Sequence, residues 1–273
     1  MLSRSERTIS SIILLVVAIV TLYPIVVLVS TAFEKANTNN TGISFFSQLS
    51  FSSFKYAWTQ GHFSQYTLHT AIMTVSVMVL SVLVAVVAAY AVALLRPLGS
   101  KLLFYVAILS FMLPVEVLIT PWFYELQYLG WLNTYWALII PQLAQSIAFG
   151  IFWMNSAFLG VPKELTEAAI LDGASRLDVF RLVLVPNVMP AIKTMAALVF
   201  LWTWNAFLLP LVLVSKTSLF VDTIGLSNFQ GAHFQNSGAL AAGAVLTALP
   251  VVLVYLLSQR SFISGMFAGS TVG

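Results

Sequence analysis

Long apolar stretches without a single charge dominate the chain, and within them the apolar residues are continuous rather than alternating with polar ones. This pattern is typical of helices that cross a bilayer, whereas membrane barrels alternate apolar and polar positions. A helix needs about 20 such residues to span the hydrocarbon core. The pattern predicts six spans, at about 9–30, 68–95, 102–120, 134–158, 191–214 and 238–257. We therefore expect an all-α integral membrane protein with six transmembrane helices.

The composition supports a membrane protein and excludes several other classes. Of the 273 residues, 60% are hydrophobic and only 8% are charged, against about 25% charged in soluble domains. This polar surface is too small to cover a soluble enzyme or a nucleic-acid-binding module. The chain has no cysteine and no phosphate-binding loop motif, and its three histidines are scattered. We therefore expect no catalytic residue, no metal site and no nucleotide hydrolysis on this chain.

The placement of Lys and Arg predicts the orientation. With the N-terminus inside, only Lys35, Lys55 and Lys216 of the 12 basic residues fall on the outer side. The positive-inside rule favours this topology, in which both termini are cytoplasmic. The first apolar run is longer than the core of a usual signal peptide, so we expect it to be kept as a membrane helix.

One charged segment, residues 160–190, breaks the apolar pattern on the predicted cytoplasmic side. Its first part is a run of strong helix formers that ends at Gly173, where a C-terminal cap belongs. Ser175 and Asp178 have the spacing of a capping box, which predicts a second helix. Pro186 is expected to end that helix. The segment thus predicts a helix–glycine–helix element.

The same segment carries a recognisable motif. Glu167-Ala168-Ala169, then Gly173 after three residues, then Pro186 at the end of a Val-Leu-Val-Pro run, resembles the EAA signature of membrane subunits of binding-protein-dependent ABC importers. Two valines replace the Ile and Leu of the family pattern, which are conservative changes. Several fixed residues at these spacings between two apolar runs make the resemblance specific.

Further stretches narrow the resemblance to carbohydrate-type permeases, similar to the maltose-system G subunit. They are Gly130-Trp131-Leu132-Asn133-Thr134, Trp204-Asn205 and Gly265-Met266-Phe267-Ala268-Gly269. The chain departs from the family pattern at Ala206, usually acidic, at His69, usually Asn, and in a tail without the usual Lys. The resemblance implies a type I ABC importer permease fold. It divides the chain into a first helix with its outer segment (1–66), a transmembrane domain (67–260) and a cytoplasmic tail (261–273).

The resemblance also implies partners and a location. The expected partners are a second permease subunit in a heterodimer, two ATPase subunits that hold ATP and Mg, an extracytoplasmic solute-binding protein, a sugar substrate and membrane lipid. No nucleic acid is expected, and no cofactor on this chain. The location would be the inner membrane of a prokaryote. The coupling helices at about 161–186 would dock on the ATPase through Glu167, Ala168, Ala169, Asp172, Gly173 and Pro186. The alternative is an ordinary amphipathic loop on the membrane surface.

Polar residues within the predicted spans are candidates for the substrate path, because they are expensive in a bilayer and usually face the bundle interior. Gln142, Gln145 and Ser146 form one stripe of the fourth span, at i, i+3 and i+4. Trp204 and Asn205 lie in the fifth span. Amides bind hydroxyl groups and an indole stacks on a sugar face. The alternative is that these groups only hold helices together through hydrogen bonds.

Two further sets of candidates remain open. Glu116, near the outer end of the third span, either lines the path or reaches the interface. Gly231, His233 and Phe234 either contact the binding protein or form a passive connector. The predicted function is ATP-driven import of a sugar or oligosaccharide, by a subunit that is not itself an enzyme. The alternatives are the same importer class for a glycerol-phosphate-type or other polar solute, and a passive channel or secondary carrier.

Overall fold

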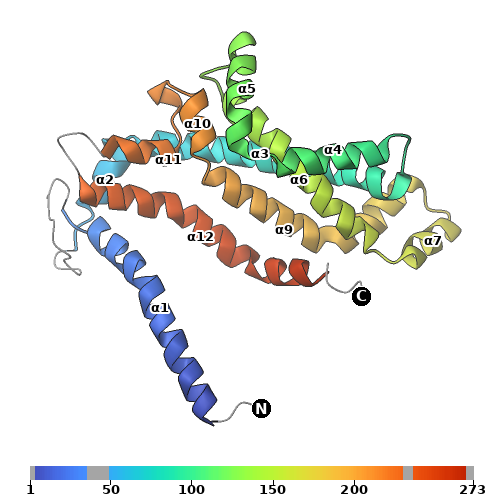
Figure 1. Ribbon diagram of the computed structural model, residues 1–273, viewed down its shortest axis with the longest axis horizontal. Helices are drawn as coiled ribbons and strands as arrows, with labels where there is room; N and C mark the ends of the chain where they lie inside the picture. The colour runs from blue at the N-terminus through green and yellow to red at the C-terminus, as the bar shows by residue number, and fades with distance from the viewer. Residues whose placement is uncertain (1–3, 36–48, 230–235, 269–273) are drawn as a thin grey trace. The chain divides into compact units, whose positions relative to one another are not determined.

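The computed structural model describes residues 4–35, 49–229 and 236–268, and every regular element among them is a helix (Figure 1). They form two compact units. One contains Met1–Thr67 and Asp222–Leu249, and the other contains Leu68–Val221 and Pro250–Gly273. The longer helices are α1 (Arg4–Ala32), α3 (Phe63–Tyr90), α4 (Ser100–Met112), α5 (Val115–Tyr128), α6 (Tyr135–Leu159), α9 (Val185–Trp204) and α12 (Ser237–Ala268). The shorter ones are α2 (Ser52–Thr59), α7 (Lys163–Leu171), α8 (Arg176–Asp178), α10 (Leu208–Leu213) and α11 (Asp222–Gly225).

Within the described residues, five helices are long and apolar enough to cross a membrane, or six if a bent pair is counted as one span. The bent pair is α4 and α5, whose axes turn by 102°. The predicted third span at 102–120 therefore coincides with a bent pair of helices and not with one continuous helix. Leu113 takes an extended conformation, with ψ at 126°, because the ring of Pro114 disfavours the helical region for the preceding residue.

The fifth predicted span, 191–214, is also broken. α9 ends at Trp204, and α10 begins only at Leu208. At its other end the helical run starts at Arg176 and continues to Trp204, so the expectation that Pro186 ends a separate helix is wrong. Val179–Leu184 form a π-helical turn, in which the Val185 N–H bonds to the Phe180 carbonyl. This wider turn accommodates a proline that has no N–H of its own to donate.

The first unit is held by aromatic packing and a few buried polar contacts. The ring of Phe63 stacks on that of Phe229, with centroids 5.6 Å apart. The hydroxyl of Thr67 donates to a carboxylate oxygen of buried Asp222 at 2.8 Å. These contacts join the start of α3 to the segment that precedes α12.

In the second unit, α6 is the central helix and packs against α4 and α9. A close approach occurs at Gly150, where an added Cβ atom would lie 2.5 Å from the Cβ atom of Ala85 on α3. Small residues permit such close approach of membrane helices. The loop before α6 is anchored by Asn133, whose Oδ1 accepts hydrogen bonds from the backbone N–H groups of Ser215 and Lys216 at 2.7 and 2.9 Å.

Candidate functional site

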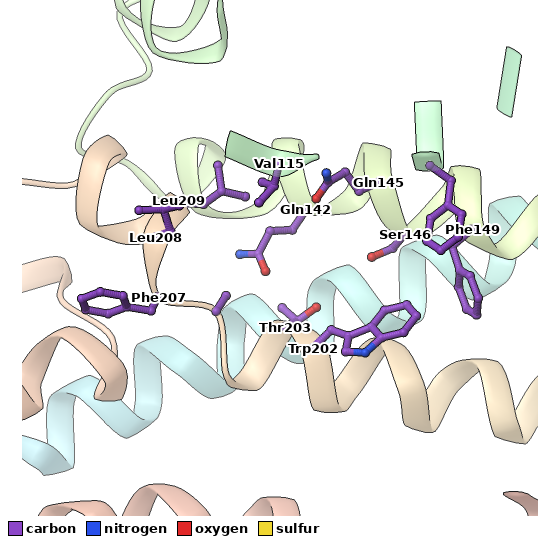
Figure 2. A pocket seen from close by; sticks show the side chains of 12 residues that line it. Val115, Gln142, Gln145, Ser146, Phe149, Trp202, Thr203, Phe207, Leu208 and Leu209 are labelled. Carbon is purple, nitrogen blue, oxygen red and sulfur yellow. The ribbon is translucent and has the colours of Figure 1, made fainter. Parts of the chain in front are cut away.

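A pocket of about 310 Å³ lies between α6 and α9 of the second unit; we call it the central pocket. Its lining residues come from α4, the start of α5, α6, the end of α9 and the chain that follows, namely Phe111, Val115, Gln142, Gln145, Ser146, Phe149, Trp202, Thr203, Ala206, Phe207, Leu208 and Leu209. Figure 2 shows Gln142 and Ser146 extending from α6 toward Thr203 and Trp202 of α9. The three polar residues predicted as one stripe of the fourth span thus line a single pocket.

The polar groups of the central pocket differ in what they can still bind. The amide nitrogen of Gln142 already donates to the Leu138 carbonyl at 2.9 Å and lies 3.1 Å from the Met73 sulfur. Its amide oxygen can therefore act only as an acceptor for a ligand. Within the described part of the chain, no hydrogen bond is recorded for the side chains of Gln145, Ser146 and Thr203. Together these groups offer both donors and acceptors to a neutral polar solute.

Aromatic rings form the remaining walls. Phe149 and Trp202 make an edge-to-face contact with their centroids 4.8 Å apart, and both line the central pocket. Aromatic faces beside amides and hydroxyls suit a sugar ring, which has an apolar face and a polar edge. None of the lining residues carries a charge, and Ala206, which replaces the acidic residue usual in the resembling family, is among them.

The other predicted path residues lie outside the lining. Trp204 is buried and stacks on Phe200 at 5.3 Å, while Asn205 is exposed and donates to the Leu201 carbonyl at 2.8 Å. Glu116 is exposed in the first turn of α5. Trp202 and Thr203 line the pocket instead. Sequence reasoning missed them because the choice between Trp202 and Trp204 depends on the rotation of α9 about its axis.

The EAA segment, residues 161–186, contains two helical pieces joined at a glycine. Gly173 has φ of +85°, a left-handed conformation that glycine adopts with little strain. Ser175 and Asp178 form the reciprocal bonds of a capping box. No residue of α7 is buried. Such a segment presents its side chains outward.

The outward side chains of the EAA segment are partly apolar. Leu171 is 88% exposed and Ile170 61%, although both are apolar and lie at the end of α7, just before Asp172 and Gly173. Leu177 and Leu182 are exposed on the following helical run. Ile170 and Leu171 lie outside the helices long enough to cross a membrane, and exposed neighbouring apolar side chains of this kind mark an interaction surface.

The EAA signature residues are distributed around this surface. Ala168, Asp172 and Pro186 are exposed, and Ala169 is half-buried. Glu167 lines a groove of about 700 Å³ together with Arg96, Lys163 and Arg176. No ion pair of Glu167 is recorded within the residues that the structure describes.

Two other predictions concern the contacts with the binding protein and the presence of a metal site. Gly231, His233 and Phe234 lie outside the described residues. Among the described residues, no three His, Asp or Glu side chains gather into a group that could hold a metal ion.

The chain is similar to known proteins of one family. Residues 81–266 match the family described as binding-protein-dependent transport system inner membrane component. A probable ABC transporter permease from Bacillus subtilis, YurM, is 34% identical over 81% of this chain and 73% of its own length. The arabinooligosaccharides transport permease AraQ from Halalkalibacterium halodurans is 30% identical over 94% of this chain and 93% of its own.

A solved structure has the same fold. It is a chain of a bacterial ABC transporter for import of the acidic polysaccharide alginate, and it matches with a TM-score of 0.79 at 23% identity. The match covers 95% of this chain and 98% of that chain.

Proposed function

Because the chain belongs to the family of binding-protein-dependent transport system inner membrane components, we propose that it is the permease subunit of an ATP-driven importer for a sugar or oligosaccharide. The observation that carries this proposal is the exposed EAA segment with its left-handed Gly173. It would dock on a separate ATPase and transmit nucleotide-driven movement to α9, because one helical run joins Arg176 to Trp204.

The assembly would contain more than this chain. We propose a heterodimer with a second permease subunit, two ATPase subunits that bind ATP and Mg, and an extracytoplasmic solute-binding protein. Both termini and the EAA segment would be cytoplasmic, as the distribution of Lys and Arg favours. Purification of the tagged chain from its host in mild detergent tests the assembly. Copurification of an ATPase, a second permease and a binding protein would support it; a homo-oligomer alone would favour the channel or carrier alternative.

The transmission step depends on the backbone at Gly173. A Cβ atom there would meet nothing within 4 Å, so substitution acts through the backbone conformation and not through a clash. The left-handed conformation costs a β-branched residue about 1–2 kcal/mol, whereas Asn tolerates it. Gly173→Val is therefore expected to lower uptake per ATP hydrolysed, with membrane insertion unchanged. Gly173→Asn is the matched control and should transport nearly normally.

This test requires uptake and ATP hydrolysis to be measured in proteoliposomes of the whole importer. Reduced coupling in Gly173→Val but not in Gly173→Asn supports the transmission role. Equal transport by Gly173→Val and the unmodified chain would refute the transmission role, because the EAA segment would then tolerate a changed turn.

The proposed substrate class rests on the central pocket and on the substrate for which one relative is named. The AraQ relative is named for arabinooligosaccharides. The uncharged lining, with Gln145, Ser146 and Trp202, favours a neutral sugar. A glycerol phosphate would leave its negative charge without a cation in this pocket, so we rank the phosphate ester second.

Gln145→Leu tests this role, with Gln127→Leu on α5 as the control because Gln127 does not line the pocket. Uptake of a panel of neutral oligosaccharides, including arabinooligosaccharides, is measured against glycerol 3-phosphate. A loss of oligosaccharide uptake confined to Gln145→Leu supports the pocket as the path. Equal uptake by both variants would show that the path lies elsewhere, and uptake of glycerol 3-phosphate alone would show that the substrate is a phosphate ester.

A further inference from the structure

A second pocket, of about 570 Å³, lies where the chain leaves α3 and enters α4, beside the last turns of α6. We call it the Arg96 pocket. It is separate from the central pocket, with which it shares no lining residue, and its lining is Val92, Ala93, Arg96, Pro97, Gly99, Ser100, Lys101, Phe104, Asn155 and Leu159. Its charged residues, Arg96 and Lys101, are both cations.

The N-terminus of α4 lies in this pocket with open backbone donors. The N–H groups of Ser100 and Leu103 bond to the carbonyls of Pro97 and Gly99. No side chain caps this helix end, and for the N–H groups of Lys101 and Leu102 no bond is recorded in the described part of the chain. A helix of 13 residues directs such free N–H groups and its positive dipole end toward a bound anion.

A buried amide on another helix points to the same ligand. Asn155 of α6 is only 9% exposed and lines the Arg96 pocket, yet no hydrogen bond of its side chain is recorded among the described residues. The amide atoms of Asn155 are accessible from the pocket, so a ligand with acceptor oxygens there would accept hydrogen bonds from its NH2 group. Ser100, 8% exposed, adds a hydroxyl beside it.

The guanidinium of Arg96 is held in position over the pocket. Arg96 has φ of +48°, a left-handed conformation uncommon for a residue with a side chain. Its Nε donates to the Ala93 carbonyl at 3.1 Å, and Ala93 itself lines the pocket. Arg96 also borders the groove that contains Glu167, but no ion pair joins the two within the described residues. The terminal guanidinium nitrogens are thus available for an anion.

We propose that the Arg96 pocket binds the phosphate of an anionic phospholipid. Arg96 and Lys101 would neutralise its charge, while the α4 N–H groups, Ser100 and Asn155 would donate hydrogen bonds to its oxygens. A lipid is favoured over a free phosphate by the surface beside the pocket. Leu98 is fully exposed in the turn between the two cations, and Leu102 and Tyr105 are exposed on α4, in a protein of the membrane. Acyl chains would cover these side chains.

The test measures retained lipid on the full-length chain with its copurified subunits. The complex is exchanged into phosphatidylcholine nanodiscs doped with phosphatidylglycerol, and bound lipid is identified by native mass spectrometry. The variant is Arg96→Gln with Lys101→Gln, and the control is Lys193→Gln, an exposed lysine that lines neither pocket. Each cation near a membrane surface contributes about fivefold to binding, so the double variant should bind phosphatidylglycerol about 25-fold more weakly.

Asn155→Leu is the second variant, since it removes the buried amide without changing charge. Preferential retention of phosphatidylglycerol that is lost in both variants and kept in Lys193→Gln supports the proposal. Equal retention of phosphatidylcholine, or equal retention by variant and control, overturns it. Displacement of the lipid by millimolar inorganic phosphate would also overturn it, because the site would then serve a free anion. None of these readouts depends on transport, so the proposal stands or fails separately from the importer function.

Discussion

Gly150 is the position at which the packing of α6 makes its sharpest prediction. A Cβ atom added there would lie 2.2 Å from the terminal methyl group of Met195 on α9 and 2.5 Å from the Cβ atom of Ala85 on α3. The methyl group ends a flexible side chain and can move. The Ala85 Cβ atom is fixed to helix backbone, so it can yield only if the helices separate. Gly150→Ala is therefore expected to destabilise the second unit.

The size of the stability loss in Gly150→Ala follows from two opposing effects. Ordinary carbon contacts are about 3.5–4.0 Å, so relief of the Ala85 contact needs about 1 Å of movement between helices. Overpacking of this kind costs about 1–3 kcal/mol, and a rigid neighbour places it near the upper end. Replacing glycine by alanine within a helix returns about 1 kcal/mol. The net loss is then about 2 kcal/mol, or roughly 30-fold in the folding equilibrium constant.

The matched control lies at the end of the same helix. At Gly160 an added Cβ atom would meet only carbonyl oxygens at 3.5 and 3.6 Å, an ordinary contact distance. Unfolding of Gly150→Ala and Gly160→Ala is compared by denaturant titration in detergent micelles. Gly160→Ala should remain close to the unmodified chain. Equal stability of the two variants would refute the reasoning, because α6 would then not be held against α3 at van der Waals contact.

The remaining predictions concern two polar anchors. Burial raises the pKa of the Asp222 carboxyl from 3.8 to about 6, with the Thr67 hydrogen bond opposing the rise. The folded state therefore favours the protonated carboxyl, whose stabilisation is complete below about pH 4 and is lost as the pH rises through about 6. Thermal unfolding at about pH 4.5, near the lower end of this window, and at about pH 7.5, above it, should differ less in Asp222→Asn than in the unmodified chain. An unchanged difference would assign the titration to other groups. Asn133→Ala removes an acceptor of three hydrogen bonds, two from Ser215 and one from Lys216, at a φ of +59°, and should lose about 2 kcal/mol. Asn133→Gly should lose less stability, because glycine adopts the left-handed backbone conformation with little strain. Equal losses of stability in denaturant titrations of the two variants would show that the backbone conformation contributes nothing to the difference.

Apolar runs were sufficient to predict which segments are helical, because a membrane segment must satisfy its backbone within a helix. The second, fourth and sixth predicted spans correspond to α3, α6 and α12 with shifted ends. The capping box at Ser175 and the turn at Gly173 were also predictable, since both depend on neighbours within a few residues. Local chemistry alone determines such features.

The structural features that the sequence does not predict depend on contacts between distant segments. The break at Pro114 has a local cause, but its 102° bend also depends on packing between α5 and α10, where Leu126 and Leu213 share a buried cluster. The sequence places Asn155 in an apolar span, but it does not show that Asn155 lines one pocket together with Arg96. Periodicity identifies the face of a helix but not the partner that the face meets.

Both unexpected breaks border the central pocket. Val115 follows the break after α4, and Ala206 and Phe207 form the break after α9. Irregular backbone at membrane depth is tolerated where it is buried or lines a cavity. At the second break no proline is present. Instead the Asn205 amide donates to the Leu201 carbonyl at 2.8 Å, the same carbonyl that accepts from the Asn205 N–H at 3.3 Å. A side chain that competes for a backbone acceptor favours a helix end. Asn205 thus contributes to the pocket by ending α9, so that Ala206 and Phe207 turn into its wall.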